Sequence, residues 1–411
     1  MRDMSGWMGA IGVLVLAGCD SEARPAADVE DTSVGEDTAA DVGEDTAEDV
    51  ADTVDTVDTN MIDTADSTDS ADSADTTPAD TTDSGDALTP PPHGKLQRSL
   101  DIAGYERHYL VHVPPNIDGS RAVPVVFMLH GTSGTGLKFY NISGWVEKAN
   151  REGFIAVFPT ALVYCLNEDE DFDGESDPGE RHVTTKWAAG KLSSERMPLC
   201  TDEEIAALPA ERQAEIEARE LQDDVAFFRA MVDELVAELP VDPKRMYVSG
   251  FSNGAQMSAR LGLEMADVFA AFASAAGGPA LSGTPARPTS YVFSVGSLDD
   301  GFLAGDPTTP DDDLAELPLD DSLLEVPRFA DLANVLATGL SLDATQYSYA
   351  LQSVNGADIA TYTFDTSAVG ADNQLIIAVI DGATHQYPNG TNHPVVMAEL
   401  LWRFFERYAL P

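Results

Sequence analysis

Cysteine is scarce in this sequence, which limits the covalent cross-links that the chain can form. Only three cysteines occur among 411 residues. Cys19 belongs to an N-terminal apolar segment, so Cys165 and Cys200 are the only pair available to each other in a folded domain. The folded part therefore holds at most one disulfide, and we expect Cys165 and Cys200 to form it in an oxidising compartment.

Positive charge is also scarce. The chain has 23 Lys and Arg residues against 71 Asp and Glu, which gives a formal net charge of −48 at pH 7. Nucleic acids and anionic lipid surfaces carry phosphate groups that would repel such a chain. The charge balance therefore argues against a nucleic-acid partner, and it bears on solubility rather than on fold.

Aromatic residues are missing from a long N-terminal stretch. Between Asp20 and Pro92 the sequence is almost entirely Asp, Glu, Thr, Ser, Ala and Val, without Phe, Trp or Tyr. So little apolar area cannot offset the conformational entropy lost on folding, and like charges repel one another. We expect residues 20–95 to form a disordered acidic linker that ends near a run of prolines. An alternative is that its carboxylate rows bind divalent cations or basic glycans.

The apolar run at the N-terminus is too short to span a bilayer. It extends from Trp7 to Ala17, the length of the hydrophobic region of a signal peptide. The run closes with Leu16 to Cys19, which resembles the bacterial lipoprotein box, where cleavage exposes a cysteine that is diacylated on its sulfur. The resemblance implies that residues 1–19 are an export signal and that lipidated Cys19 anchors the chain to a membrane of the cell envelope. The alternative is an ordinary signal of a secreted protein.

After the prolines, apolar β-branched runs alternate with segments of helical periodicity. This alternation is typical of a mostly parallel sheet with helices on both faces, so we expect residues 96–411 to form one α/β domain. The predicted strands are Arg107–Val113, placed at an edge of the sheet, Val123–Leu129, Phe154–Phe158, Met246–Ser249, Tyr291–Val295 and Leu375–Ile380. The clearest predicted helices are Asp223–Glu238, Ala255–Met265, Leu323–Leu336 and Pro394–Tyr408.

A serine lies between a predicted strand and a predicted helix. Ser252 is the centre of a GxSxG motif that runs from Gly250 to Gly254. A serine on such a sharp turn has a strained backbone, so the residues two positions before and after it must be small. The turn exposes the hydroxyl and directs the N–H of Asn253 at negative charge that forms on a substrate oxygen. We predict Ser252 as a nucleophile; the alternative is a glycine-rich turn with a bystander serine.

A second turn of small residues follows the strand Val123–Leu129. It begins with His130 and Gly131 and continues with small polar residues. When a hydroxyl attacks a carbonyl, two preset backbone N–H groups stabilise the resulting oxyanion. We predict that Thr132 supplies the second N–H beside that of Asn253. His130 is interpreted as structural, because it precedes the serine in the chain.

Two later predicted strands are followed by acids and by a histidine. Asp299 and Asp300 follow the first strand, and His385 follows the second, before the final helix. The order serine, acid, histidine is one of the known triad orders. His385 would take the proton from Ser252 and return it to the leaving alcohol, while the acid fixes its tautomer. Asp299 is preferred over Asp300 as the acid, and His393 is the weaker candidate for the base.

These motifs carry a resemblance to a known family. From about Tyr105 onward the chain resembles the polyhydroxybutyrate depolymerase family of esterases, which includes feruloyl and acetylxylan esterases. The matching residues are Arg107, Tyr109, Pro114, Leu129, His130, Gly131, Gly153, Phe154, Pro159, Asp223, Asp224, Val225, Phe227, Asp242, Arg245, Tyr247, Gly250, Ser252, Asn253, Gly254, Phe269, Ala270, Ala271, Gly296, Asp299, Gly382, His385 and Pro388. The resemblance implies the α/β-hydrolase fold and a serine triad of Ser252, Asp299 and His385 that acts on aryl, acetyl or hydroxyalkanoate esters.

The chain departs from the family pattern at two positions near the motifs. Ala255 replaces a second glycine that usually follows the asparagine, and Tyr387 replaces a tryptophan that often follows the histidine. Neither change touches the predicted chemistry. We expect Tyr387 to border the substrate.

A long insertion, from about residue 163 to 221, interrupts the compact family pattern. Five of its residues have the spacing of a calcium-binding loop, namely Asp169, Asp171, Asp173, Gly174 and Glu180. Against this interpretation, Ser176 replaces the usual apolar residue and Pro178 interrupts the exit from the loop. A structural calcium ion and a solvated acidic loop are both open interpretations.

Together these features predict an exported, monomeric serine esterase that requires no cofactor for catalysis. Its substrate would be a carboxylic ester of the polyhydroxyalkanoate, feruloyl or acetyl-polysaccharide type, and the acidic insertions favour a neutral or polymeric one. One alternative is a serine peptidase or a lipase of the same fold, although a lipase should show a large apolar lid. Another is an inactive, surface-tethered carbohydrate-binding protein.

Overall fold

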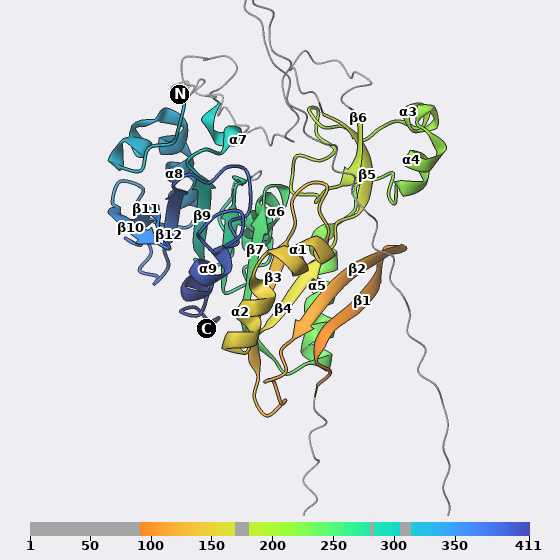
Figure 1. Cartoon of the computed structure of the whole chain (residues 1–411), viewed down its shortest axis with the longest axis horizontal. Helices are drawn as coiled ribbons and strands as arrows, with labels where there is room; N and C mark the ends of the chain where they lie inside the picture. The colour runs from red at the N-terminus through yellow and green to blue at the C-terminus, as the bar shows by residue number, and fades with distance from the viewer. Residues whose placement is uncertain (1–90, 169–180, 280–282, 305–313) are drawn as a thin grey trace, which may run out of the picture. The chain divides into compact units, whose positions relative to one another are not determined.

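A ten-stranded sheet lies at the centre of the fold (Figure 1). The structure is a computed structural model that describes residues 91–168, 181–279, 283–304 and 314–411. The strands are β1 Gly94–Ile102, β2 Tyr105–Val113, β3 Val123–Leu129, β4 Ile155–Pro159, β5 Val163–Asn167, β6 Arg181–Thr185, β7 Val241–Phe251, β8 Ala271–Ala275, β9 Ser290–Gly296, β10 Ser348–Val354, β11 Ala357–Phe364 and β12 Leu375–Ile380. The helices are α1 Gly136–Ile142, α2 Trp145–Glu152, α3 Asp202–Ala207, α4 Ala210–Glu215, α5 Asp224–Glu238, α6 Asn253–Glu264, α7 Asp300–Leu303, the 3-10 helix η3 Asp321–Glu325, α8 Pro327–Gly339 and α9 Met397–Phe405.

The central strands of this sheet are parallel. Their order across the sheet is β1-β2-β4-β3-β7-β8-β9-β12-β11-β10. The run from β4 to β12 pairs in parallel, whereas β1 and β2 at one edge and β11 and β10 at the other pair antiparallel to their neighbours. The predicted α/β fold class is therefore confirmed.

Helices cover both faces of the sheet, as Figure 1 shows. Successive side chains of β3 point to opposite faces, so Val125 and Phe127 join a core that α5, α6 and α8 complete. Val126 and Met128 join a second core with residues of α1, α2 and α9. Complete burial of an apolar side chain of this size contributes roughly 1.5–3 kcal/mol relative to exposure, so both layers hold the sheet in place.

The first two strands differ from the prediction. The strand predicted at the edge, Arg107–Val113, lies within β2, which pairs with both β1 and β4; the edge strand is β1. β1 begins at Gly94, inside the stretch predicted as linker. Its inward-facing positions include Arg98 between two leucines, and Arg98 forms an ion pair with Glu234 of α5. An arginine at an inward position hides the alternation that would have predicted this strand.

A proline divides the helix that we predicted at Leu323–Leu336. The chain forms η3 first, and α8 begins at Pro327. Proline has no N–H to donate and its fixed φ suits the first position of a helix, so a new helix starts there.

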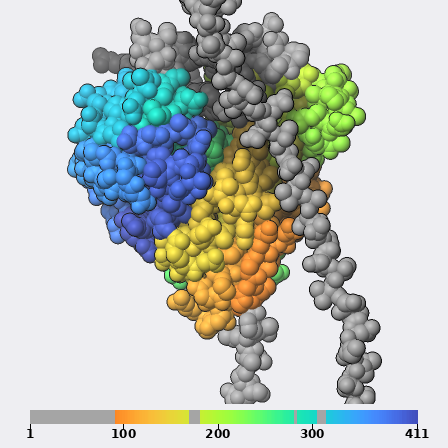
Figure 2. Space-filling model, viewed as in Figure 1, coloured from red at the N-terminus to blue at the C-terminus, as the bar shows by residue number. Residues whose placement is uncertain are grey.

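The insertion forms a small unit of its own. β5 and β6 pair as a separate two-stranded sheet, followed in the chain by α3 and α4, in yellow-green on the surface in Figure 2. A disulfide joins Cys165 of β5 to Cys200. The cross-link thereby ties the hairpin to the start of α3.

Several predicted features lie outside the described residues. They are the signal with Cys19, the linker up to residue 90, and the calcium-ligand set Asp169, Asp171, Asp173 and Glu180. Among the residues that the structure describes, none of the helices combines the length and the apolar character needed to cross a membrane.

Candidate active site

Ser252 lies at the turn between β7 and α6. Its backbone angles are φ 52° and ψ −119°, which non-glycine residues rarely adopt. A Cβ atom added to Gly250 would lie 2.0 Å from the carbonyl oxygen of Gly254, and one added to Gly254 would lie 2.3 Å from that of His130. The sequence motif did not reveal Gly277, where an added Cβ would lie 2.2 Å from Ser252 O. This strained strand-to-helix turn at the end of a parallel strand is the serine turn of the α/β-hydrolase fold.

Three side chains form a hydrogen-bonded chain at this turn. Ser252 Oγ lies 3.0 Å from His385 Nε2, and His385 Nδ1 lies 3.0 Å and 3.2 Å from the two carboxylate oxygens of Asp299. Asp299 is fully buried and His385 is 19% exposed on its side chain. Asp300 is exposed, and its carboxylate accepts a hydrogen bond from the N–H of Gly301. Asp299, the preferred candidate acid, is therefore hydrogen-bonded to the histidine.

The turns that carry Asp299 and His385 are held against each other. They follow β9 and β12, which pair in parallel up to Gly296 and Ile380, so both turns emerge at the same edge of the sheet. The hydroxyl oxygen of Ser297 accepts a hydrogen bond from the N–H of Gly382 at 2.9 Å and donates one to Glu316 at 2.9 Å. Ser297 and Glu316 are positioning residues that sequence reasoning missed, because no motif connects them.

Both predicted oxyanion donors lie next to the serine turn. Asn253 is the first residue of α6. The loop with Thr132 packs close to the serine, since a Cβ added at Gly131 would lie 3.1 Å from Ser252 Cβ. Within the described residues, the backbone N–H groups of Thr132 and Asn253 have no acceptor in the protein. Both N–H groups are therefore available as hydrogen-bond donors, as the predicted oxyanion role requires.

His130 stabilises this loop from within. The side chain is fully buried; its Nδ1 hydrogen-bonds the carbonyl oxygen of Gly131 at 2.7 Å, and its Nε2 accepts from the N–H of Ala161 at 3.0 Å. Burial lowers the pKa of His130 to about 4, because an imidazolium would lose its hydration there. A neutral, internally bonded histidine agrees with the structural interpretation of His130.

Tyr387 does not border an open site, contrary to our expectation. Its side chain is only 3% exposed, its hydroxyl accepts a hydrogen bond from Trp145 Nε1 at 3.1 Å, and burial raises its pKa. The half-buried ring next to the histidine is Phe251, whose centroid lies 5.2 Å from that of His385. Tyr387 packs edge-on against Phe251. The sequence placed Tyr387 near the histidine but could not tell which way its ring points.

A metal ion would have to compete with this hydrogen-bonded chain. Asp299, Asp300 and His385 each offer one ligand atom, and these atoms lie within 4.8 Å of one another. Asp299 and His385 are already hydrogen-bonded to each other. We therefore interpret the group as part of the serine site.

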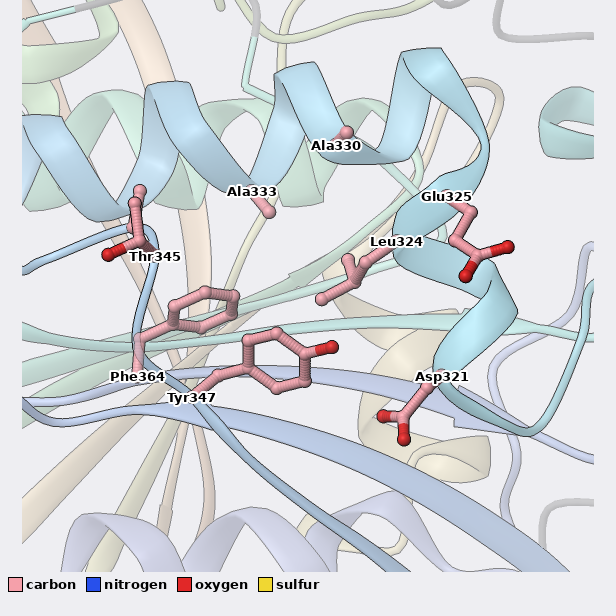
Figure 3. A pocket seen from close by; sticks show the side chains of 9 residues that line it. Asp321, Leu324, Glu325, Ala330, Ala333, Thr345, Tyr347 and Phe364 are labelled. Carbon is pink, nitrogen blue, oxygen red and sulfur yellow. The ribbon is translucent and has the colours of Figure 1, made fainter.

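A separate pocket lies among η3, α8 and the residues that lead into β10 (Figure 3). Its volume is about 250 Å³. The rings of Tyr347 and Phe364 form one wall, and the carboxylates of Asp321 and Glu325 lie at one end. None of the lining residues belongs to the serine turn, the histidine turn or the loop with Thr132.

No family model matches the chain. Three curated proteins are similar in sequence. NocK, a candidate esterase of Nocardia uniformis subsp. tsuyamanensis, is 27% identical over 59% of this chain and 56% of its own length. Feruloyl esterase B of Piromyces equi is 29% identical over 41% of this chain and 24% of its own length. Poly(3-hydroxyalkanoate) depolymerase C of Paucimonas lemoignei is 28% identical over 41% of this chain and 30% of its own length.

The chain thus spans between a quarter and about half of the length of these relatives. Among solved structures, an acetyl xylan esterase from Aspergillus awamori is 14% identical, with a TM-score of 0.44 over 75% of this chain and 99% of that chain. The predicted resemblance to esterases of the feruloyl esterase and polyhydroxyalkanoate depolymerase type is confirmed by the sequence relatives.

Proposed function

We propose that the chain is a serine esterase in which Ser252 is the nucleophile, His385 the base and Asp299 the acid. The observation that carries the proposal is the continuous hydrogen-bonded chain from Ser252 Oγ through both ring nitrogens of His385 to the buried carboxylate of Asp299. This is the geometry by which a weak hydroxyl nucleophile is activated. Two relatives that are named esterases and one that is named a polyhydroxyalkanoate depolymerase support the same reaction class.

Each step of ester hydrolysis has a group to perform it. Ser252 Oγ attacks the ester carbonyl while His385 Nε2 takes its proton, and the N–H groups of Asn253 and Thr132 donate to the oxyanion. His385 then gives the proton to the leaving alcohol, and an acyl group remains on Ser252. A water molecule then attacks the acyl carbonyl while His385 takes one of its protons. His385 returns that proton to Ser252 Oγ as the bond to the acyl group breaks and the acid leaves. Asp299 fixes the tautomer of the neutral imidazole and stabilises the positive charge of the imidazolium that forms when His385 takes a proton. No step calls for a cofactor.

The proposed substrates are carboxylic esters of the feruloyl, acetyl-polysaccharide or polyhydroxyalkanoate type. The support is the set of relatives together with the net charge of −48, which disfavours anionic substrates. The proposal includes export by residues 1–19, with lipidated Cys19 holding a monomeric enzyme at a membrane or release of the protein by secretion.

A calcium ion bound by Asp169, Asp171, Asp173 and Glu180 is also proposed, as a structural element of the insertion. Binding to the folded state alone would raise the melting temperature when calcium is added and lower it again with a chelator. An unchanged melting temperature would favour the solvated acidic loop.

The test of the esterase function is hydrolysis of short p-nitrophenyl acyl esters and of methyl ferulate by the full chain. The matched control is Ser252→Ala, which removes only the nucleophile. We expect turnover by the wild type and background hydrolysis by the variant, and the rates on different esters rank the acyl groups. Equal background hydrolysis by both proteins would overturn the proposal and favour an inactive binding protein.

A further inference from the structure

A short segment of the insertion contacts both halves of the predicted oxyanion hole. It is the stretch Thr185–Trp187, at the end of β6. The carbonyl oxygen of Thr185 accepts a hydrogen bond from the N–H of Ser133 at 3.1 Å, and its hydroxyl donates one to the carbonyl oxygen of Gly134 at 2.7 Å. Thr185 therefore holds the loop with Thr132 on its C-terminal side.

Trp187 holds the same loop on its N-terminal side. Its indole Nε1–H donates to the carbonyl oxygen of His130 at 2.9 Å, and the two rings pack with centroids 5.0 Å apart. That carbonyl oxygen also lies against Gly254 of the serine turn, where an added Cβ would come within 2.3 Å of it. A shift of His130 would therefore displace Thr132 and would also change the contact with the serine turn.

The backbone of Trp187 also hydrogen-bonds the side chain of Asn253, the residue after the nucleophile. Its backbone N–H donates to Asn253 Oδ1 at 2.6 Å, and its carbonyl oxygen accepts from Asn253 Nδ2 at 3.3 Å. Trp187 is 0% exposed, so its side chain cannot reach a substrate. Its effect on the reaction has to pass through Asn253 and His130.

We propose that Trp187, together with Thr185, is a positioning residue that sets the spacing of the two oxyanion donors, the N–H groups of Asn253 and Thr132. The inference rests on the proposed esterase function. Preset donors are effective because they need no reorganisation when the oxyanion forms, so a small displacement lowers the rate without weakening substrate binding in the ground state. Through these contacts the insertion would position the oxyanion donors of the catalytic site.

The test is Trp187→Phe, which keeps a buried ring and removes the indole donor to His130. We expect kcat on p-nitrophenyl acetate to fall by about 10- to 100-fold with KM changed by less than about threefold. The affinity for phenylboronic acid, whose adduct with Ser252 places an oxygen in the oxyanion hole, should fall by a similar factor. The control is Trp402→Phe, at a buried tryptophan of α9 whose Nε1 has no hydrogen-bond partner in the described residues. It should keep kcat near the wild-type value.

A second variant covers the case in which Trp187→Phe does not fold. Thr185→Val removes the hydroxyl donor to Gly134 at a half-buried position and should lower kcat by at least about threefold at similar KM. An unchanged kcat in a folded Trp187→Phe, or in Thr185→Val if the former does not fold, would overturn this inference alone. Wild-type turnover no faster than that of Ser252→Ala would overturn the esterase proposal and this inference with it.

Discussion

The backbone at Ser252 adopts a conformation that its surroundings must hold in place. A non-glycine residue with φ 52° and ψ −119° stores roughly 1–3 kcal/mol of strain. The N–H of Ser252 donates to the carbonyl oxygen of Ala275 at 2.9 Å, and Gly250, Gly254 and Gly277 allow the neighbouring backbone to come close. The strained turn directs the hydroxyl to His385, 3.0 Å away.

Replacement of the buried acid tests the proposed triad at a single residue. Asp299→Asn keeps the shape of the side chain but removes the charge that stabilises a His385 imidazolium, so kcat should fall by about 10⁴-fold. Asp300→Asn removes the neighbouring, exposed carboxylate and should leave kcat within a few-fold of the wild type. Steady-state kinetics on p-nitrophenyl acetate measures both. A large loss in Asp300→Asn with activity kept in Asp299→Asn would reverse the two roles.

The buried histidine predicts how stability depends on pH. The pKa of His130 is lowered from 6.5 to about 4 by burial, so between these values the unfolded chain binds a proton that the folded protein does not. The contribution of neutral His130 to the free energy of unfolding is therefore fully present above pH 6.5 and is lost as the pH falls toward 4. The total loss is roughly 3 kcal/mol. Urea unfolding at pH 7.5, 6 and 4.5 should show that the free energy of unfolding falls more steeply with decreasing pH for the wild type than for His130→Asn. Parallel losses in the two proteins would contradict the assignment.

At the scale of elements, the insertion depends on its own hairpin and cross-link. β5 and β6 pair along their full length, and Cys165 of β5 lies opposite Val183 of β6. The same hairpin ends at Thr185, which hydrogen-bonds the loop with Thr132. A change in the conformation of the hairpin would therefore be transmitted to the loop with Thr132 through these hydrogen bonds.

Loss of the disulfide should destabilise the protein measurably. The bond closes a loop between cysteines 35 positions apart, for which chain entropy gives about 2–4 kcal/mol. We expect the double variant Cys165→Ser, Cys200→Ser to unfold at lower urea concentration than the wild type. A reductant should lower the urea concentration at which the wild type unfolds to that of the variant, and it should not change the value for the variant. If reductant shifts both proteins equally, the effect does not come from this bond.

The whole molecule carries a strong negative field, which should affect the choice of substrate. With a net charge of −48, an anionic ester meets repulsion that a neutral ester of similar size does not. We expect kcat/KM for mono-p-nitrophenyl succinate to be at least about tenfold below that for p-nitrophenyl butyrate at 10 mM salt. The gap should narrow at 0.5 M salt, because the screening length falls from about 30 Å to a few ångströms. A ratio that does not change with salt would mean that local contacts, and not the field, set the preference.

The sequence by itself determined the features that are local in the chain. The GxSxG motif between a strand and a helix located Ser252, and the turns after two apolar strands located Asp299 and His385, because parallel strands bring their ends to one edge of a sheet. Other elements were missed for physical reasons. β8 is rich in alanine, which favours helices over strands, and in β1 an inward Arg98 interrupts the apolar pattern.

Only the tertiary structure decided the contacts between residues far apart in the chain. The sequence could not show that Tyr387 is buried and packs against Phe251. It also could not show that Trp187 hydrogen-bonds Asn253, which lies 66 positions later in the chain. Local propensity and periodicity say which segments form strands and helices. They carry no information on which side chains meet, because those contacts depend on how all the elements pack together.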